Sequence, residues 1–133
     1  IKTSKEQASI IFCGTGADGQ KADEIRKAGA EVVFLDTTDG LVPLDKVLDE
    51  LGQREILSLL VEGGAGINAS LIENKLADKY LAFVAPKIAG GTSSPGPVAG
   101  QGVKLMSDAI ALHDVEYRFF AQDVLISGYF DNE

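Results

Sequence analysis

The chain has 133 residues, 45% of them hydrophobic and 24% charged, which is enough to bury the core of one domain. Its 20 acidic and 12 basic residues give a net charge of −8, and the basic residues form no cluster, so binding to nucleic acid or to an anionic membrane is disfavoured. One cysteine and one histidine are too few for a disulfide or a Cys/His metal cluster, so we expect no metal site.

Strands and helices alternate through the first half of the sequence. We predict strands over residues 8–13 and 31–35, on either side of a helix over residues 21–28. A second helix is predicted over residues 42–51, where apolar side chains recur at helical spacing. Residues 56–61, ILSLLV, form a continuous apolar run, which is typical of a central strand buried on both faces of a sheet.

The second half of the sequence changes in character after one more helix. That helix is predicted over residues 67–76, followed by a strand over 80–85 and a long Gly/Pro/Ser loop over 86–97. Residues 109–122 and 123–130 are rich in β-branched and aromatic side chains, which predicts two adjacent strands. The order of elements favours a single α/β domain, residues 1–133, with a mostly parallel central sheet flanked by helices and a C-terminal antiparallel β-hairpin.

A first glycine motif, GTGADG, follows the first predicted strand. Gly14, Gly16 and Gly19 satisfy the G-x-G-x-x-G pattern of a dinucleotide-binding turn, and Asp36 closes the next strand, where such a site places its ribose-binding acid. With 15 glycines in the chain, an ordinary surface turn ending in Asp-Gly explains the pattern equally well. The pattern alone leaves both interpretations open.

A second glycine motif, EGGAG, lies between the predicted central strand and the helix that follows. Gly63 and Gly64 have no Cβ, so a ligand can approach the backbone, and the first amides of the helix are donors without partners. A phosphate or pyrophosphate is the expected ligand. Glu62, just before the glycines, is either a solvated acid at a strand end or a carboxylate that faces a substrate.

Several stretches of the chain resemble one known family. They are ILSLLVEGG (residues 56–64), LADK (76–79), YLAFVAPKIAGG (80–91) and DVLISGYF (123–130). In this order and spacing they are similar to the C-terminal reductase domain of the bacterial bifunctional riboflavin-biosynthesis deaminase/reductase. The resemblance implies a dihydrofolate-reductase-like fold and NADPH-dependent reduction of the ribosyl chain of 5-amino-6-(5-phosphoribosylamino)uracil to ribityl.

The resemblance also implies roles for residues of the second glycine motif. Glu62 matches the acidic residue that faces the substrate, where it would hold polar groups and favour the form that accepts hydride. Gly63 and Gly64 match the pair that contacts the cofactor pyrophosphate, often through a cis peptide bond. With the free amides of the helix start added, the residues expected to bind the cofactor here are Gly63, Gly64, Ala65, Gly66 and Ile67.

Two further sites follow from the same resemblance. Lys87 is a candidate contact for the substrate phosphate or the cofactor, although a lysine in an exposed loop is more often simply solvated. In the implied fold, Gly14, Thr15 and Gly16 lie where the adenosine 2′-phosphate of NADPH is usually received. Asp36 then loses its ribose-binding role, and His113, without an identifiable partner, is expected to be a half-exposed strand residue.

The family's reductase domain begins with a further strand-helix-strand-helix segment that has no counterpart before Ile1. We therefore expect a truncated domain whose free sheet edge favours a homodimer, and a full-length protein with an N-terminal deaminase domain. No apolar run reaches the roughly 18 residues needed to span a bilayer, and IKTSKEQ lacks the apolar core of a signal peptide, so we expect a cytoplasmic protein. The alternatives are a non-catalytic nucleotide-binding or regulatory module, and a related pterin or pyrimidine reductase.

Overall fold

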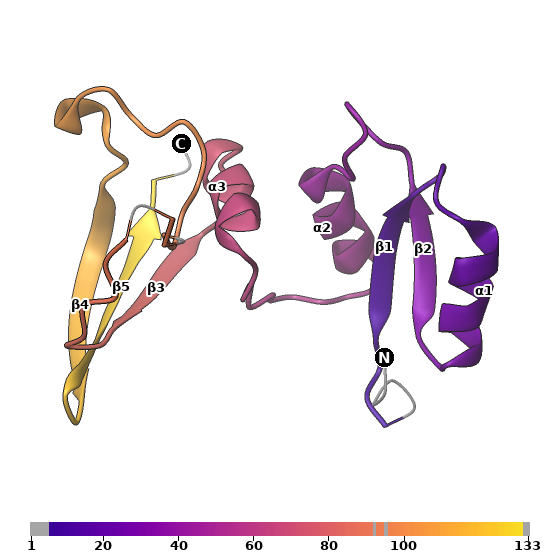
Figure 1. The fold of residues 1–133 in the computed structure, drawn as a ribbon, viewed down its shortest axis with the longest axis horizontal. Helices are drawn as coiled ribbons and strands as arrows, with labels where there is room; N and C mark the ends of the chain where they lie inside the picture. The colour runs from indigo at the N-terminus through magenta and orange to yellow at the C-terminus, as the bar shows by residue number, and fades with distance from the viewer. Residues whose placement is uncertain (1–5, 92, 95, 132–133) are drawn as a thin grey trace. The chain divides into compact units, whose positions relative to one another are not determined.

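The computed structural model describes residues 6–91, 93–94 and 96–131. The chain divides into two compact units, residues 1–59 and 60–133, and each unit has its own sheet (Figure 1). The expectation that residues 1–133 form a single reductase domain stays a prediction.

The first unit is a strand-helix-strand motif followed by one more helix. Strands β1 (Ile10–Gly14) and β2 (Glu31–Leu35) pair in parallel, and helix α1 (Gly19–Lys27) makes the crossover between them, as Figure 1 shows. A parallel pair requires such a crossover, because a short turn cannot bring the chain back in the same direction. Helix α2 (Leu44–Gln53) follows β2. The buried apolar residues of this unit are Ala22, Ala30, Val32 and Leu51.

Two arginines tie the helices of the first unit to β2. The Arg26 side chain in the last turn of α1 donates to the carbonyl of Val32 at 3.2 Å, and its guanidinium lies 5.4 Å from the centre of the Phe34 ring. Arg54, just after α2, donates to both carboxylate oxygens of Glu31 at 2.7 Å. The hydrogen bonds from Arg54 hold the pKa of the Glu31 carboxyl below its usual value.

The second unit carries an antiparallel sheet of three strands in the order β3-β5-β4. These strands are β3 (Lys79–Val84), β4 (Leu112–Phe120) and β5 (Asp123–Phe130), and the short 3-10 helix η1 (Met106–Asp108) precedes β4. The expected C-terminal hairpin is confirmed, because β4 and β5 pair antiparallel around a tight turn.

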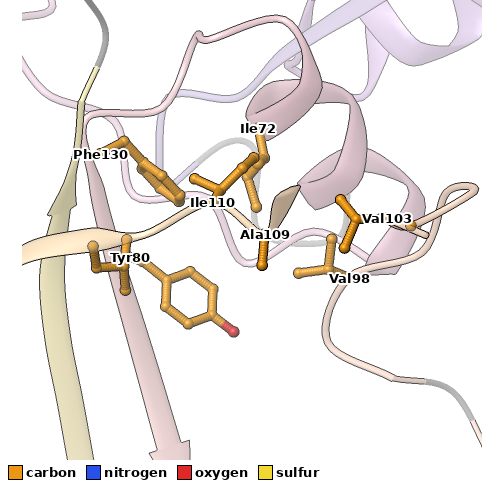
Figure 2. A pocket seen from close by; sticks show the side chains of 9 residues that line it. Ile72, Tyr80, Val98, Val103, Ala109, Ile110 and Phe130 are labelled. Carbon is orange, nitrogen blue, oxygen red and sulfur yellow. The ribbon is translucent and has the colours of Figure 1, made fainter. Parts of the chain in front are cut away.

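Helix α3 (Ala65–Glu73) belongs to the same unit and buries Ala69 and Leu71. One face of the sheet carries Tyr80 and Phe130, whose rings meet edge to face with their centres 6.3 Å apart. The end of this face, the α3 residue Ile72 and the segment before β4 together line an apolar pocket (Figure 2).

The predicted central strand over residues 56–61 is wrong. Residues 56–64 are neither strand nor helix, and the side chain of Leu57 is 97% exposed. An apolar run becomes a strand only when another strand donates and accepts its backbone hydrogen bonds, and no strand in the described part of the chain pairs with it. The single, mostly parallel central sheet is therefore not confirmed: the described strands form a parallel pair and a separate antiparallel sheet.

The other predicted elements are present, with some ends shifted by a few residues. The strands predicted over 31–35 and 123–130 have the observed bounds of β2 and β5. The helix predicted over 67–76 begins and ends earlier, as α3, because Gly64 is its N-cap. The predicted loop over 86–97 lacks regular structure where it is described, and its residues Thr92 and Pro95 lie outside the described residues.

Candidate functional site: the start of α3

The first turn of α3 exposes backbone donors to an open space. Gly64 is the N-cap in an extended conformation, and its carbonyl accepts the first intrahelical hydrogen bond, from the amide of Ile67 at 3.0 Å. The amides of Ala65 and Gly66 precede that bond, so helix geometry provides them with no partner. A Cβ added to Gly64 or Gly66 would meet nothing within 4 Å, so the backbone here is open to a ligand.

This start differs from those of the other two α-helices that the structure describes. At α1 the Asp18 carboxylate accepts from the amides of Gln20 and Lys21, so a negative charge already occupies the positive end of the helix. At α2 the first turn contains Asp45. The first turn of α3 contains no acidic residue, and no side chain caps it. An anion is therefore favoured at α3 more than at α1 or α2.

Gly63 is closely packed, and its backbone is outside the left-handed region that favours glycine. A Cβ at this position would lie 3.1 Å from the Cβ of Ile67, tighter than most real contacts. The residues described contain no cis peptide bond, so the cis bond expected between Gly63 and Gly64 is not present in this structure. The turn is formed by a trans peptide, with Gly64 at φ −69° and ψ 167°.

The structure places the two predicted substrate residues on separate segments of the second unit. Glu62 is exposed on the segment that leads into Gly63, and Lys87 is exposed in the loop after β3, where its backbone amide donates to the carbonyl of Ala85 at 2.8 Å. No hydrogen bond or ion pair joins Glu62 to Lys87 in the structure as described. Residues 63–67 form one continuous turn and helix start. They are the predicted site residues of this unit that the structure brings together.

The first glycine motif lies in the first unit, at the carboxyl end of β1. The amide of Thr15 donates to the carbonyl of Leu35 at 3.1 Å, and the amide of Ala17 donates to the carbonyl of Gly14 at 2.9 Å. A Cβ on Gly14 would lie 2.5 Å from the Thr37 methyl group, so the glycine permits close packing of this turn. The motif therefore forms a surface turn that leads into a helix whose start is capped by its own aspartate.

The prediction that His113 is a half-exposed strand residue is confirmed. His113 is in β4 with its side chain 52% exposed, and its ring stacks on Tyr129 with the ring centres 5.9 Å apart. In the part of the chain that is described, no group of three His, Cys, Asp or Glu side chains is placed to hold a metal ion.

A contact that was not predicted from the sequence joins α3 to the glycine-rich segment after residue 96. The Asn68 side chain donates to the carbonyl of Pro97 at 2.9 Å, and the amide of Ala99 donates to the carbonyl of Ala65 at 3.0 Å. No local pattern could have revealed it, because the pairs are separated by about thirty residues of chain and a single asparagine in a helix has many roles.

Comparison with known proteins identifies the family. Residues 1–126 match the family described as the RibD C-terminal domain. The chain belongs to this family. The resemblance noted in the sequence is thereby confirmed over nearly the whole chain.

Curated RibD-type relatives match at moderate identity. The riboflavin biosynthesis protein RibD of Actinobacillus pleuropneumoniae is 29% identical over 126 residues, 95% of this chain and 33% of the relative. A protein of Aquifex aeolicus named 2,5-diamino-6-ribosylamino-4(3H)-pyrimidinone 5′-phosphate reductase is 36% identical over 112 residues, 84% of this chain and 49% of the relative. The chain thus spans about a third to a half of the length of these two relatives.

Solved structures of proteins of riboflavin biosynthesis share the fold of this chain. Acinetobacter baumannii RibD superposes with a TM-score of 0.71 and 21% identity, covering 92% of this chain and 31% of that one. The riboflavin biosynthesis reductase Rib7 of Saccharomyces cerevisiae superposes with a TM-score of 0.64 and 19% identity, covering 93% of this chain and 69% of that one. The chain therefore shares the α/β fold of these solved structures.

Proposed function

We propose that the chain is a reductase domain of riboflavin biosynthesis that uses NADPH to convert the ribosyl chain of 5-amino-6-(5-phosphoribosylamino)uracil into ribityl. The observation that carries this proposal is membership of the RibD C-terminal domain family over residues 1–126. The exposed, uncapped start of α3 supports it, because a nicotinamide dinucleotide needs a place for its phosphates.

The residues we assign to the cofactor surround that helix start. The open backbone at Gly64 and Gly66, with the amides of Ala65 and Gly66, fits a pyrophosphate, and Gly63 and Ile67 pack together beneath the turn. When bound, NADPH supplies the hydride, so the protein has to provide position and electrostatics rather than a nucleophile.

Glu62 is the residue we assign to the substrate as a catalytic group. Its carboxylate is exposed one residue before Gly63, so it can reach a substrate that lies next to the cofactor. A negative charge there stabilises positive charge that develops on the substrate as it becomes ready to accept hydride. Lys87, exposed after β3, is assigned to the substrate phosphate, which an ammonium group attracts.

The first glycine motif is assigned to the adenosine end of the cofactor and not to its pyrophosphate. We assign Gly14, Thr15 and Gly16 to the adenosine 2′-phosphate of NADPH, through the threonine hydroxyl and backbone donors of the exposed turn. The Asp18 carboxylate occupies the start of α1, which argues against a pyrophosphate there.

The relative from Aquifex aeolicus favours a second candidate substrate. Its name specifies 2,5-diamino-6-ribosylamino-4(3H)-pyrimidinone 5′-phosphate, which keeps an amino group where the uracil compound has a carbonyl. A protein that reduces this compound acts before the deamination step, whereas one that reduces the uracil compound acts after it. A purely nucleotide-binding or regulatory module is the remaining alternative, and it predicts cofactor binding without turnover.

For the whole protein we propose a cytoplasmic enzyme with a small-molecule substrate, an N-terminal deaminase domain and a homodimeric assembly. The relatives named RibD extend well beyond the length of this chain, which leaves room for the deaminase domain. Within the described residues, no helix is both long and apolar enough to cross a membrane.

An assay of NADPH oxidation by the full-length protein tests the proposal. Each of the two pyrimidine compounds is supplied separately, and the loss of NADPH absorbance is followed. We expect oxidation with the uracil compound. Oxidation only with the diaminopyrimidinone would favour the second candidate, and cofactor binding without oxidation of NADPH by either compound would favour the regulatory module.

A further inference from the structure

The segment that follows Gly96 is hydrogen-bonded to the first turn of α3. The Asn68 side-chain amide donates to the carbonyl of Pro97 at 2.9 Å, and the amide of Ala99 donates to the carbonyl of Ala65 at 3.0 Å. Both contacts involve residues of the helix start. Residues 97–100, which we call the anchor segment, therefore run along the beginning of α3.

The anchor segment approaches the helix closely at Gly100. This residue has φ +92°, a conformation that favours glycine, and a Cβ built on it would meet a carboxylate oxygen of Glu73 and lie 3.5 Å from the Cβ of Ala69. A larger residue would strain the backbone of the segment at this φ, whereas the Glu73 carboxylate, at the end of a flexible side chain, can move aside. The contact thus extends from the first turn of α3 to its last turn.

Apolar packing beneath the anchor segment is incomplete. Val98 and Val103 on the chain segment and Ile72 on α3 lie around one apolar pocket, as Figure 2 shows. The volume of this pocket is about 300 Å³. Val98 is itself 39% exposed. The two hydrogen bonds to α3 are therefore specific contacts that hold the segment beside this open apolar surface.

The start of α3 has no capping side chain, in contrast to α1, where Asp18 holds the first turn. Helix ends fray when their first turn has few partners. The anchor segment supplies partners at the carbonyl of Ala65 and the side chain of Asn68, and it leaves the amides of Ala65 and Gly66 open.

We propose that Asn68 is a positioning residue, which holds the anchor segment on α3 and so orders the backbone amides that receive the cofactor phosphates. This inference rests on the proposed function. In it, Asn68 touches neither cofactor nor substrate, and it acts through the geometry of the first helical turn.

The test is Asn68→Ala in the full-length protein, with NADPH kinetics at saturating substrate. Loss of one hydrogen bond that orders the site is expected to raise the KM for NADPH by about three- to tenfold. The kcat should stay within about twofold, because the chemistry of bound cofactor is unchanged. Asn68→Gln keeps an amide donor and should recover part of the loss.

Asn74→Ala is the matched control. Asn74 is the C-cap of the same helix, and its side chain donates to the carbonyl of Ser70 at 2.7 Å without reaching the anchor segment. If loss of a side-chain hydrogen bond acted only by destabilising α3, Asn68→Ala and Asn74→Ala would change the KM for NADPH alike. We expect the KM for NADPH to be unchanged in Asn74→Ala.

A second variant keeps the inference falsifiable if Asn68→Ala folds poorly. Gly100→Ala strains the backbone of the anchor segment at φ +92° without altering Asn68, so it should disturb the same attachment and also raise the KM for NADPH. If the unaltered protein does not bind NADPH, the proposed function fails. If the unaltered protein binds NADPH and the KM is the same in Asn68→Ala, Gly100→Ala and Asn74→Ala, the role of Asn68 is overturned and the proposed function stands.

Discussion

Asp18 caps α1 by accepting a hydrogen bond from the backbone amide of Gln20 at 2.9 Å. The glycines on either side of it fit a dinucleotide motif, yet the helix start that this motif should leave open is occupied by a carboxylate of the chain itself. The start of α3 has no such group. The choice between the two glycine motifs therefore depends on which helix start is open to an anion, and the structure favours α3.

Removal of the Asp18 cap should lower stability. We expect Asp18→Ala to reduce the free energy of unfolding by about 1 kcal/mol, since it leaves the amide of Gln20 without its acceptor. Urea denaturation measures the change. Asp18→Asn keeps an acceptor and should lose much less, so equal losses in the two variants would show that the cap hydrogen bond is not the cause.

Gly63→Ala should weaken cofactor binding. The added methyl group would lie 3.1 Å from the Cβ of Ile67, so the Ile67 side chain and the first turn of α3 would have to give by a few tenths of an ångström. We expect a higher KM for NADPH, measured by steady-state kinetics. Gly52→Ala is the control, because a Cβ there meets nothing within 4 Å; an unchanged KM in Gly63→Ala would remove the turn from the cofactor site.

Glu62→Gln should lower turnover while NADPH binding is kept. The variant removes the negative charge next to the proposed substrate position, and we expect a loss of about 10²-fold in kcat. Stopped-flow kinetics separates binding from reduction. Glu55→Gln, which changes an exposed acid elsewhere in the chain, should behave like the unaltered protein. A turnover unchanged by Glu62→Gln would exclude the residue from the mechanism.

The ion pair of Glu31 and Arg54 should make stability depend on pH. Hydrogen bonds from Arg54 lower the pKa of Glu31 from its ordinary value of 4.5, so the folded state binds the proton less readily than the unfolded state. The contribution is then fully present above about pH 4.5 and is lost as the pH falls through the lower, folded pKa.

Glu31→Gln tests this expectation. Its midpoint of urea denaturation should lie below that of the unaltered protein at neutral pH, by a small amount because the pair is exposed. The difference should shrink in acid below the ordinary pKa of the carboxyl group. A difference that is constant across this range would mean that the charge of Glu31 contributes nothing.

The sequence predicted elements well where local rules decide them. β2 and β5 were predicted to the residue, because each is a β-branched and aromatic run bounded by residues that end strands. The start of α3 was predicted two residues late, since the apolar stripe begins at Ile67 whereas the backbone becomes helical directly after Gly64.

Long-range partners could not be predicted. Residues 56–61 have the apolar character of a central strand, but strand pairing depends on a neighbour that the run itself does not specify. The same reason explains why the bond from Asn68 to Pro97 was missed. That the glycines of the second motif lead into a helix start could be predicted, because missing Cβ atoms and free helix amides are local properties, and their role in binding a cofactor stays a prediction.

The most direct test of the proposed reaction follows the transferred hydrogen. The full-length protein is supplied with NADPH that carries deuterium at the reactive position of the nicotinamide and with the ribosylaminouracil phosphate, and the product is examined by mass spectrometry and NMR. We predict a ribityl product with deuterium on the carbon that was bonded to the amine in the ribosyl chain. Oxidation of NADPH without deuterium in a ribityl product, or no oxidation at all, would contradict the account.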